Sequence, residues 1–277
     1  MPVAQREALA ELLWQIDTLG FSEKERREVL CVEAFFSPDR YTPSFLSGVA
    51  FLLEASGVEP SHCVAAVQDF DPEEWLDKYR SSFREFAVGD CYFIYPPWRE
   101  PCSRYPVNIL IEPTMAFGTG THESTQLAML ALKPVLPDVG SMLDVGTGSG
   151  ILSIAAKALK PGLPVTAFDT DVLAARAASR NLHKNQITDV RLFVGDTMAL
   201  KSGFDLVVAN LTLEIFKQLA GELTRLSNRH LILSGFTSDH SEHVLQLFKR
   251  VLPCEISNVL VANEWACLHL QHETTSD

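Results

Sequence analysis

The sequence predicts an α/β fold whose main sheet holds five parallel strands and a closing antiparallel hairpin, seven strands in all. Three observations predict it. From Gly140 onward, short apolar runs alternate with segments of helical spacing, the rhythm of a parallel sheet with helices on both faces. The glycine-rich run VGTGSG lies at the first change from strand to helix. Near the C-terminus, two apolar runs follow each other with too few residues between them for a crossover helix.

The strands and helices can be assigned in order. SMLDV is a short apolar strand, ILSIAAKALK a helix rich in small residues, PVTAF a strand, and DVLAARAASRNLHKN a helix with a closing Asn. VRLFV and FDLVVA are strands, TLEIFKQLAGELTRL is a helix and RHLILS a strand. A helix from about Ser238 to Arg250 precedes EISNVLVA and EWACLHL, which we expect to form the hairpin around Asn263. Ligand chemistry is expected beyond the carboxyl ends of the parallel strands.

The N-terminal part of the chain has a different pattern. We expect helices near Glu7 to Leu19 and near Ser44 to Ala55, and strands near VLCVEAFF and CVAAVQDF, which together make a small α/β unit. The run Glu23 to Glu28, EKERRE, is most simply a solvent-exposed turn, with contact to a partner as the alternative. The proline-rich YPPWREPCSRYP favours a stiff, extended connection. The sequence therefore predicts a small domain at 1–75, a linker at 76–105 and a larger domain at 106–277.

Composition narrows the classes of function. The chain of 277 residues has a formal net charge of -12, which opposes broad contact with nucleic-acid phosphates and suits a basic protein partner. No segment approaches the apolar length that spans a bilayer, and MPVAQREALAELLWQ lacks the order of a signal peptide, so we expect a soluble, cytoplasmic protein. We expect buried free thiols rather than a zinc site, because no C-x-x-C pair occurs among Cys31, Cys63, Cys91, Cys102, Cys254 and Cys267.

The run VGTGSG favours a nucleotide-type ligand over a simple turn. Gly146, Gly148 and Gly150 follow a strand and open a helix, where backbone without a Cβ can approach a ligand closely. A dinucleotide fingerprint, G-x-G-x-x-G, would need its third glycine at Ile151, which weakens the case for NAD. Asp169 stands 23 residues after Gly146 at the end of a strand, where a carboxylate can accept both hydroxyls of a ribose.

These features favour an adenosine-type ligand without a pyrophosphate, and S-adenosylmethionine fits them. Asp169 would hold the ribose, and Asp196 in VGDTM the exocyclic amine of adenine. Gly146 would lie beside the amino-acid tail. The alternative is a plain strand–turn–helix whose acids face solvent, and for Asp196 taken alone that alternative carries more weight.

A second glycine–threonine loop, PTMAFGTGTHEST, begins at Pro113. Gly118 and Gly120 let backbone groups close over a charged ligand where side chains would clash. Thr121 is the expected cap of a helix that starts near His122. Phe117 either supplies an apolar wall to the ligand or packs in the core.

Both loops and their surroundings resemble the ribosomal protein L11 methyltransferase family, a branch of the class I S-adenosylmethionine-dependent enzymes. The resemblance runs from about Asp71 to Leu270 and is carried by EPTMAFGTGTHESTQLAM, LDVGTGSGILSIAA, AFDTD, VVANLT and LILSG. It implies a Rossmann-like methyltransferase domain in which the first loop is a lid over the methionine end of S-adenosyl-L-methionine and the second its floor. It also implies that Thr125, Gly146, Asp169 and Asn210 contact the cofactor. The full set of candidate cofactor residues is Phe117, Gly118, Thr119, Gly120, Thr121, Thr125, Asp144, Gly146, Gly148, Asp169, Asp196 and Asn210.

The resemblance further implies methyl transfer to an amine, either a lysine side chain or an N-terminal amine. The acceptor would be a basic ribosomal protein, most simply L11, recruited by the N-terminal domain. Asn210, the carbonyl of Leu211, and Thr212 are the candidates for orienting that amine. His122 is a candidate general base, although a histidine in the first turn of a helix is more often structural or solvated.

Three departures from the family pattern bear on the substrate. Thr147 stands where the family usually has cysteine, and the run NLTL from Asn210 stands where it usually shows N-I-L-A. The chain begins almost directly in a helix, whereas the family's N-terminal domain generally opens with a strand. The second departure touches the acceptor pocket, and the third puts the identity of the protein substrate in doubt.

Other functions stay open. The chain could methylate another protein or a small-metabolite amine, or it could bind the cofactor without turnover. Nucleic-acid base methylation is disfavoured, because NLTL is not the N-P-P-aromatic tetrad of enzymes that flip a base, and the net charge is negative. His240 and His243 have an i, i+3 spacing that could suit a metal, but they more simply mark a solvated helix start. The oligomeric state does not follow from the sequence.

Overall fold

The computed structural model describes residues 20–26, 29–35, 83–113, 120–251 and 254–272. The chain divides into two compact units, Met1–Trp75 and Leu76–Asp277. In the first, β1 (Gly20–Arg26) pairs antiparallel with β2 (Val29–Phe35), so the strand expected at VLCVEAFF is confirmed. The turn expected at EKERRE is wrong for Glu23 to Arg26, which lie in β1, because pairing with the apolar β2 outweighs their polar composition. Outside the described residues lie the helices expected at Glu7 to Leu19 and Ser44 to Ala55, and the strand expected at CVAAVQDF.

The second unit is built on a seven-stranded sheet of order β11-β12-β10-β9-β6-β7-β8. The strands from β8 to β10 pair in parallel, and β12 pairs antiparallel with both β10 and β11, which confirms the predicted sheet and its C-terminal hairpin. Asn263, at the tip of the hairpin, has a φ of 52°. The strands are β6 (Met142–Val145), β7 (Val165–Asp169), β8 (Val190–Val194), β9 (Phe204–Asn210), β10 (Ser227–Thr237), β11 (Cys254–Ala262) and β12 (Trp265–His272).

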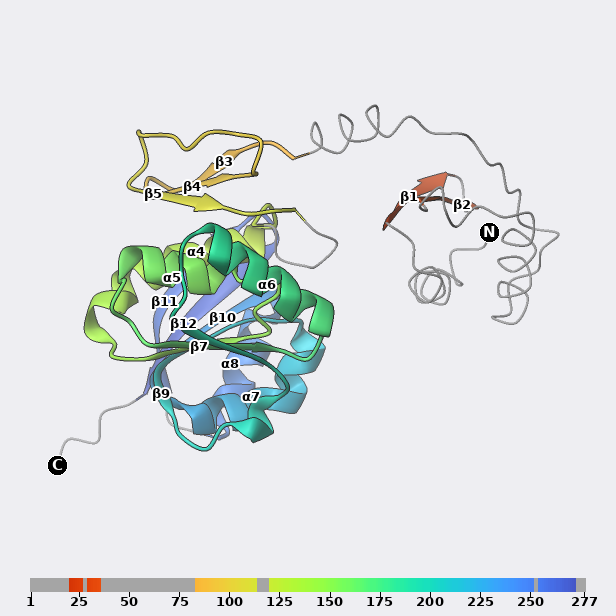
Figure 1. The fold of residues 1–277 in the computed structure, drawn as a ribbon. Helices are drawn as coiled ribbons and strands as arrows, with labels where there is room; N and C mark the ends of the chain where they lie inside the picture. Colours follow the sequence, from red (N-terminus) through yellow and green to blue (C-terminus); the bar gives the residue numbers. More distant parts are fainter. Residues whose placement is uncertain (1–19, 27–28, 36–82, 114–119, 252–253, 273–277) are drawn as a thin grey trace. The chain divides into compact units, whose positions relative to one another are not determined.

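Helices cover both faces of this sheet (Figure 1). On β9, Leu206 and Val208 join the apolar cluster of the first face, while Val207 and Ala209 join that of the second, and all are fully buried. A strand buried on both faces is a continuous apolar run, as FDLVVA is. The first face carries α4 (Glu123–Val135), α5 (Ile151–Leu159) and α6 (Val172–Lys184), and the second carries α7 (Leu213–Leu226) and α8 (Ser241–Lys249).

A second, three-stranded sheet occupies much of the segment expected to be a linker. It consists of β3 (Phe86–Val88), β4 (Tyr92–Tyr95) and β5 (Val107–Leu110), with β3 and β4 antiparallel and β4 and β5 parallel. Tyr92 is fully buried, and its hydroxyl donates to the carbonyl of Met129 on α4 at 3.0 Å. Residues 83–105 therefore belong to the body of the second unit rather than to an extended connection. The prolines that suggested a linker lie between β4 and β5.

Three expectations drawn from composition concern thiols, membranes and metals. Cys91, Cys254 and Cys267 are buried and Cys102 is half-buried. In the part of the chain that the structure describes, no helix combines the length and the apolar character needed to cross a bilayer. Within the same residues, no group of three or more His, Cys, Asp and Glu side chains is arranged to hold a metal ion.

Candidate active site

The carboxyl ends of the central parallel strands meet at one edge of the sheet. β6 leads into Gly146, β7 ends at Asp169 and β9 ends at Asn210. The register places Val145 opposite both Phe168 and Ala209, so the residues that follow these three positions lie side by side. The structure thus brings together three of the residues singled out from the sequence, at the edge where ligand chemistry was expected.

The glycine-rich loop after β6 depends on positive φ angles and on close packing. Gly146 and Gly150 have φ angles of 65° and 82°. A Cβ on Gly146 would lie 2.7 Å from Cδ2 of Leu211, and one on Gly150 would lie 3.2 Å from Cα of Ala178 on α6. Side chains at these positions would push the loop away from both β9 and α6. Their absence keeps the backbone N–H groups of the loop at the edge of the sheet.

Asp169 is held in place by two backbone bonds. Its Oδ2 accepts from the N–H of Gly148 at 2.9 Å, and its Oδ1 accepts from the N–H of Asp171 at 3.0 Å. A carboxylate has about four acceptor sites, so each oxygen keeps capacity for one more donor. A pair of neighbouring hydroxyls, such as those of a ribose, suits that remaining capacity.

Asp144, on β6, carries a buried carboxyl that is only partly bonded. Its Oδ2 accepts from the hydroxyls of Thr147 at 2.7 Å and Ser153 at 2.6 Å, whereas its Oδ1 has no partner among the described residues. Burial is the main cause that raises the pKa of this carboxyl above its usual range. Thr147, which stands where the family usually has cysteine, therefore orients the Asp144 carboxyl through its hydroxyl. Its backbone also forms part of the glycine-rich loop.

Asn210 connects β9 to the first turn of α4. Its Nδ2 donates to Oγ1 of the buried Thr125 at 3.0 Å, and its Oδ1 is buried with no partner among the described residues. Ser234 on β10 strengthens the same junction, since its hydroxyl donates to the carbonyl of Ser124 at 2.8 Å. Asn210 thus offers one amide oxygen from a fixed position.

Gly235 is a site residue that the sequence did not single out. It has a φ of 98° and lies where the register of β10 with β12 shifts. A Cβ at this position would lie 2.5 Å from the carbonyl oxygen of Leu211 and 2.9 Å from Oδ1 of Asn210. Any side chain at 235 would therefore cover both oxygens. The available signal was a glycine within the run LILSG, because glycine in a strand marks a bulge or a close approach.

The N-cap of α4 is not the residue that the sequence predicted. Glu123 is the first helical residue, so the N-cap is His122 and Thr121 lies one position too early. Nδ1 of His122 accepts from the N–H of Ser124 at 3.3 Å, and its ring packs edge-on against Trp265 with centroids 4.3 Å apart. These contacts give His122 the structural role weighed against a general base.

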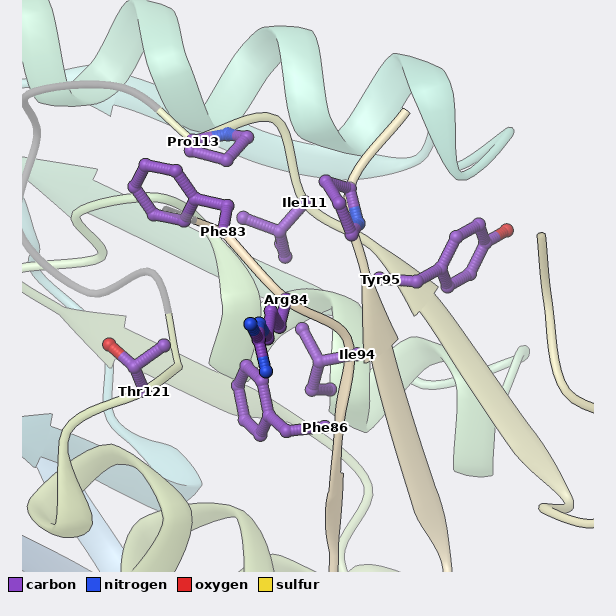
Figure 2. Close-up of a pocket in the computed structure, with 9 residues that line it drawn as sticks. Phe83, Arg84, Phe86, Ile94, Tyr95, Ile111, Pro113 and Thr121 are labelled. Carbon is purple, nitrogen blue, oxygen red and sulfur yellow. The ribbon is translucent and has the colours of Figure 1, made fainter. Parts of the chain in front are cut away.

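The second half of the first loop rests on the small sheet. A Cβ on Gly120 would lie 2.6 Å from Cδ1 of Ile151 and 3.2 Å from Cζ of Phe86 on β3, so the loop leaves no space there. Beside it is a shallow pocket (Figure 2), whose lining includes Pro113 and Thr121, the described flanks of the loop. Phe117, Gly118 and Thr119 lie outside the described residues. The pocket is lined by Phe83, Arg84, Phe86, Ile94, Tyr95, Pro96, Ile111, Pro113 and Thr121.

The remaining candidates are exposed. Asp196 follows β8, and its Oδ1 accepts from the N–H of Met198 at 2.8 Å, which leaves its other oxygen directed to solvent or a ligand. Thr212 precedes α7 but makes no side-chain capping bond, so its hydroxyl is available. His240 and His243 are exposed at the start of α8, in agreement with a solvated helix start.

Comparison with known proteins points to one family. The family model for ribosomal protein L11 methyltransferase (PrmA) matches residues 6–273. The ribosomal protein L11 methyltransferase of Helicobacter acinonychis is 37% identical over 204 residues, which cover 72% of this chain but only 60% of that protein. The protein of the same name from Geotalea daltonii is 30% identical, with 99% of this chain and 96% of that protein covered.

One solved structure supports the same assignment. It is a ribosomal protein L11 methylase from Lactobacillus delbrueckii subsp. bulgaricus, with a TM-score of 0.63 and 30% sequence identity. The alignment covers 69% of this chain and 100% of that one. This likeness confirms the Rossmann-like methyltransferase fold that the sequence predicts.

Proposed function

This chain belongs to the ribosomal protein L11 methyltransferase family, and from that premise we propose that it transfers methyl groups from S-adenosyl-L-methionine to amines of a ribosomal protein, L11 or its counterpart. The observation that carries the proposal is a pair of buried oxygens, Asp144 Oδ1 and Asn210 Oδ1, at the carboxyl edge of the sheet, neither of which has a partner among the residues that the structure describes. Buried polar atoms are nearly always bonded, so two unbonded acceptors at one edge favour a ligand with donor groups.

The cofactor would be held by residues from three strands. Asp169 has capacity for the ribose hydroxyls, and Asp196, at the end of the neighbouring β8, would accept from the adenine amine. Asp144 Oδ1 suits a cationic group such as the ammonium of the amino-acid tail. When bound, S-adenosyl-L-methionine supplies a methyl group already activated by the positive charge on its sulfur. The chain therefore mainly has to align the acceptor and keep water out.

The acceptor amine would be oriented by Asn210 Oδ1, the carbonyl of Leu211 and the hydroxyl of Thr212. A lysine with a pKa of about 10.4 is only ~0.1% neutral at pH 7, so the site has to favour the free base. An amide oxygen and a carbonyl accept N–H bonds without adding a negative charge that would stabilise the ammonium form. Gly235 supports this arrangement, because a side chain at that position would crowd both oxygens.

The N-terminal unit would recruit the basic substrate by its charge. Residues 1–75 hold 5 Lys and Arg against 14 Asp and Glu, so they carry -9 of the chain's formal net charge of -12. The remaining 202 residues carry only -3. An acidic unit attracts a lysine-rich protein and accelerates their encounter at low salt. Since ribosomal proteins are made in the cytoplasm, the proposal places the enzyme there.

The proposal is tested by labelling. Purified protein is incubated with methyl-labelled cofactor and with ribosomes, with free ribosomal protein L11 and with lysate, using Asn210→Ala as the matched control. We expect a labelled L11 band with the wild-type protein and almost none with the variant. Mass spectrometry of that band decides between lysine side chains and the N-terminal amine.

Other outcomes would support the rival functions. Label confined to the small-molecule fraction would favour a metabolite amine as acceptor, and label in another protein would replace L11 as the substrate. Binding of the demethylated cofactor without any labelled acceptor would favour a module that binds but does not turn over. Failure to bind either form of the cofactor in calorimetry would remove the proposal altogether.

A further inference from the structure

Asn181 on α6 is a buried amide that the proposed function does not use. Its side chain is fully buried on a helix face otherwise made of alanine and leucine. Its Oδ1 accepts from the backbone N–H of Glu112 at 3.0 Å, and its Nδ2 donates to the backbone carbonyl of Ser149 at 2.9 Å. Burying an amide at such a position is costly unless both ends are bonded, and here both are.

Both partners of Asn181 belong to segments that lead to the site. Glu112 lies two residues beyond the end of β5 and directly precedes Pro113, where the first loop begins. Ser149 lies within the glycine-rich loop, next to Gly148, whose N–H holds the Asp169 carboxylate. One side chain therefore connects the start of the first loop to the middle of the second.

The two bonds require a side chain with one donor and one acceptor. An N–H has to face the Ser149 carbonyl and an oxygen has to face the Glu112 N–H, which fixes the orientation of the amide. An aspartate of the same shape keeps the acceptor but places an oxygen against the Ser149 carbonyl. The close packing of Gly150 on Ala178, one turn earlier on α6, leaves little room for the loop to adjust.

We propose that Asn181 is a positioning residue that sets the spacing of the two ligand-facing loops, and through Gly148 the placement of Asp169. This inference rests on the proposed function, because it assigns the two loops to one cofactor. Asn181 does not touch the cofactor or the acceptor. Its loss should therefore weaken cofactor binding while the chemical step, once both substrates are bound, proceeds at a similar rate.

Asn185, one turn later at the C-cap of α6, serves as the control. Its side chain bonds both the N–H and the carbonyl of Leu110 on β5, at 2.9 and 2.7 Å, and its Nδ2 also donates to the backbone carbonyl of Asn181 at 2.8 Å. Among the described residues it makes no bond to the glycine-rich loop, so a change at Asn185 disturbs the same region of α6 without removing the bond to Ser149. Asn181 and Asn185 thus hold two nearby points of one segment, Glu112 and Leu110, through side-chain amides, and only Asn181 reaches Ser149. A difference between their variants isolates the connection between the loops.

The test compares Asn181→Asp with Asn185→Asp in the full chain. We expect Asn181→Asp to bind S-adenosylhomocysteine about tenfold more weakly than the wild-type protein, and to raise the KM for the methyl donor similarly with kcat little changed. Asn185→Asp should stay within about twofold for both constants. Should the aspartate variant fail to fold, Asn181→Ser and Asn185→Ser give the same comparison with a smaller side chain.

A second measurement does not depend on turnover. Hydrogen exchange in the protein without cofactor should show faster exchange at the N–H of Gly148 in Asn181→Asp than in Asn185→Asp. Equal binding and equal exchange in the two variants would overturn the inference, as would a loss of kcat at unchanged KM. Absence of binding in the wild-type protein would instead remove the proposed function, and with it the premise of the inference.

Discussion

The two edges of the main sheet treat buried polar groups in opposite ways. At the amino edge, the side chain of Lys157 is 4% exposed, and its ammonium bonds the carbonyl of Pro161, the carbonyl of Leu163 at 3.0 Å and Oδ2 of Asp189 at 2.7 Å. All of its donors are used. At the carboxyl edge, Asp144 and Asn210 each keep a buried oxygen without a partner among the described residues. We infer that the saturated Lys157 serves stability, and that the two oxygens at the carboxyl edge are left for a ligand.

The largest effect should come from Asn210→Ala at the unsaturated edge. Removing the amide takes away the proposed acceptor for the amine, and misplaced reactants commonly cost ~100-fold in rate, about 2.7 kcal/mol. The fold should survive, because the main loss is one bond to Thr125. Activity assays and thermal melts check this together. Unchanged turnover would show that the amide oxygen is not part of the acceptor site.

Lys157→Met tests the saturated edge and should have the converse effect. The variant keeps the aliphatic volume but leaves two backbone carbonyls without their donor, which should lower the free energy of unfolding by about 2 kcal/mol. The Kd for the cofactor should stay unchanged. Denaturant titration and calorimetry measure the two quantities. A marked loss of cofactor binding would contradict the separation of the two edges.

Gly235→Ala should have a smaller effect on rate. The added methyl group would meet the Leu211 carbonyl at 2.5 Å and force a shift beside Asn210, so we expect about a tenfold loss of activity and some loss of stability. Gly221→Ala is the control, because a Cβ there meets nothing within 4 Å. Equal activity in both variants would show that the space beside the Leu211 carbonyl and Asn210 Oδ1 is not needed for activity.

The smallest effect should come from the buried pair His230 and His269. This pair lies at the amino edge, but unlike the ammonium of Lys157 it is not fully hydrogen-bonded within the described residues. Nδ1 of His230 bonds Nε2 of His269 at 3.2 Å, while Nε2 of His230 has no partner among the described residues. Burial lowers the pKa of His230, and it lowers the pKa of His269 to about 4. Both rings are therefore neutral in the folded protein at neutral pH.

These lowered pKa values make the folded protein less stable at acidic pH. Between pH 6.5 and about 4, His269 binds a proton in the unfolded chain but not in the folded protein. The contribution of His269 to the free energy of unfolding is therefore complete above pH 6.5 and is lost as the pH falls toward about 4. Denaturant titrations at pH 7 and pH 5 should show a smaller loss of stability for His269→Gln than for the wild-type protein. An equal loss in both would mean that the histidine pair does not contribute.

Sequence periodicity was enough for the sheet, and it placed three candidate site residues at one edge of that sheet. The alternation of apolar runs and helical segments gave all seven strands, because buried parallel strands and amphipathic helices differ in period. The candidates Gly146, Asp169 and Asn210 were singled out because each lies at the end of a predicted strand or directly after it. The small sheet was missed, since prolines in the connection after β4 masked the short alternating run YFIY.

The remaining misses concern contacts between distant segments. Asn181 reads as one more polar residue on a helix, and its partners at Glu112 and Ser149 are 69 and 32 residues away. Gly235 is important because of the oxygens of Leu211 and Asn210, which arrive from another strand. The cap at His122 instead of Thr121 was a one-residue error of the usual size for helix ends. Periodicity reports local structure and says nothing of such pairings.

The seat of Gly120 against Phe86 and Ile151 limits how the chain can vary among species. Any side chain at position 120 would meet Cδ1 of Ile151 at 2.6 Å, and Ile151 is the first residue of the helix that follows the glycine-rich loop. A residue larger than glycine at position 120 would therefore disturb both loops at once. We expect natural variants of this protein to keep glycine there while the exposed positions around it change.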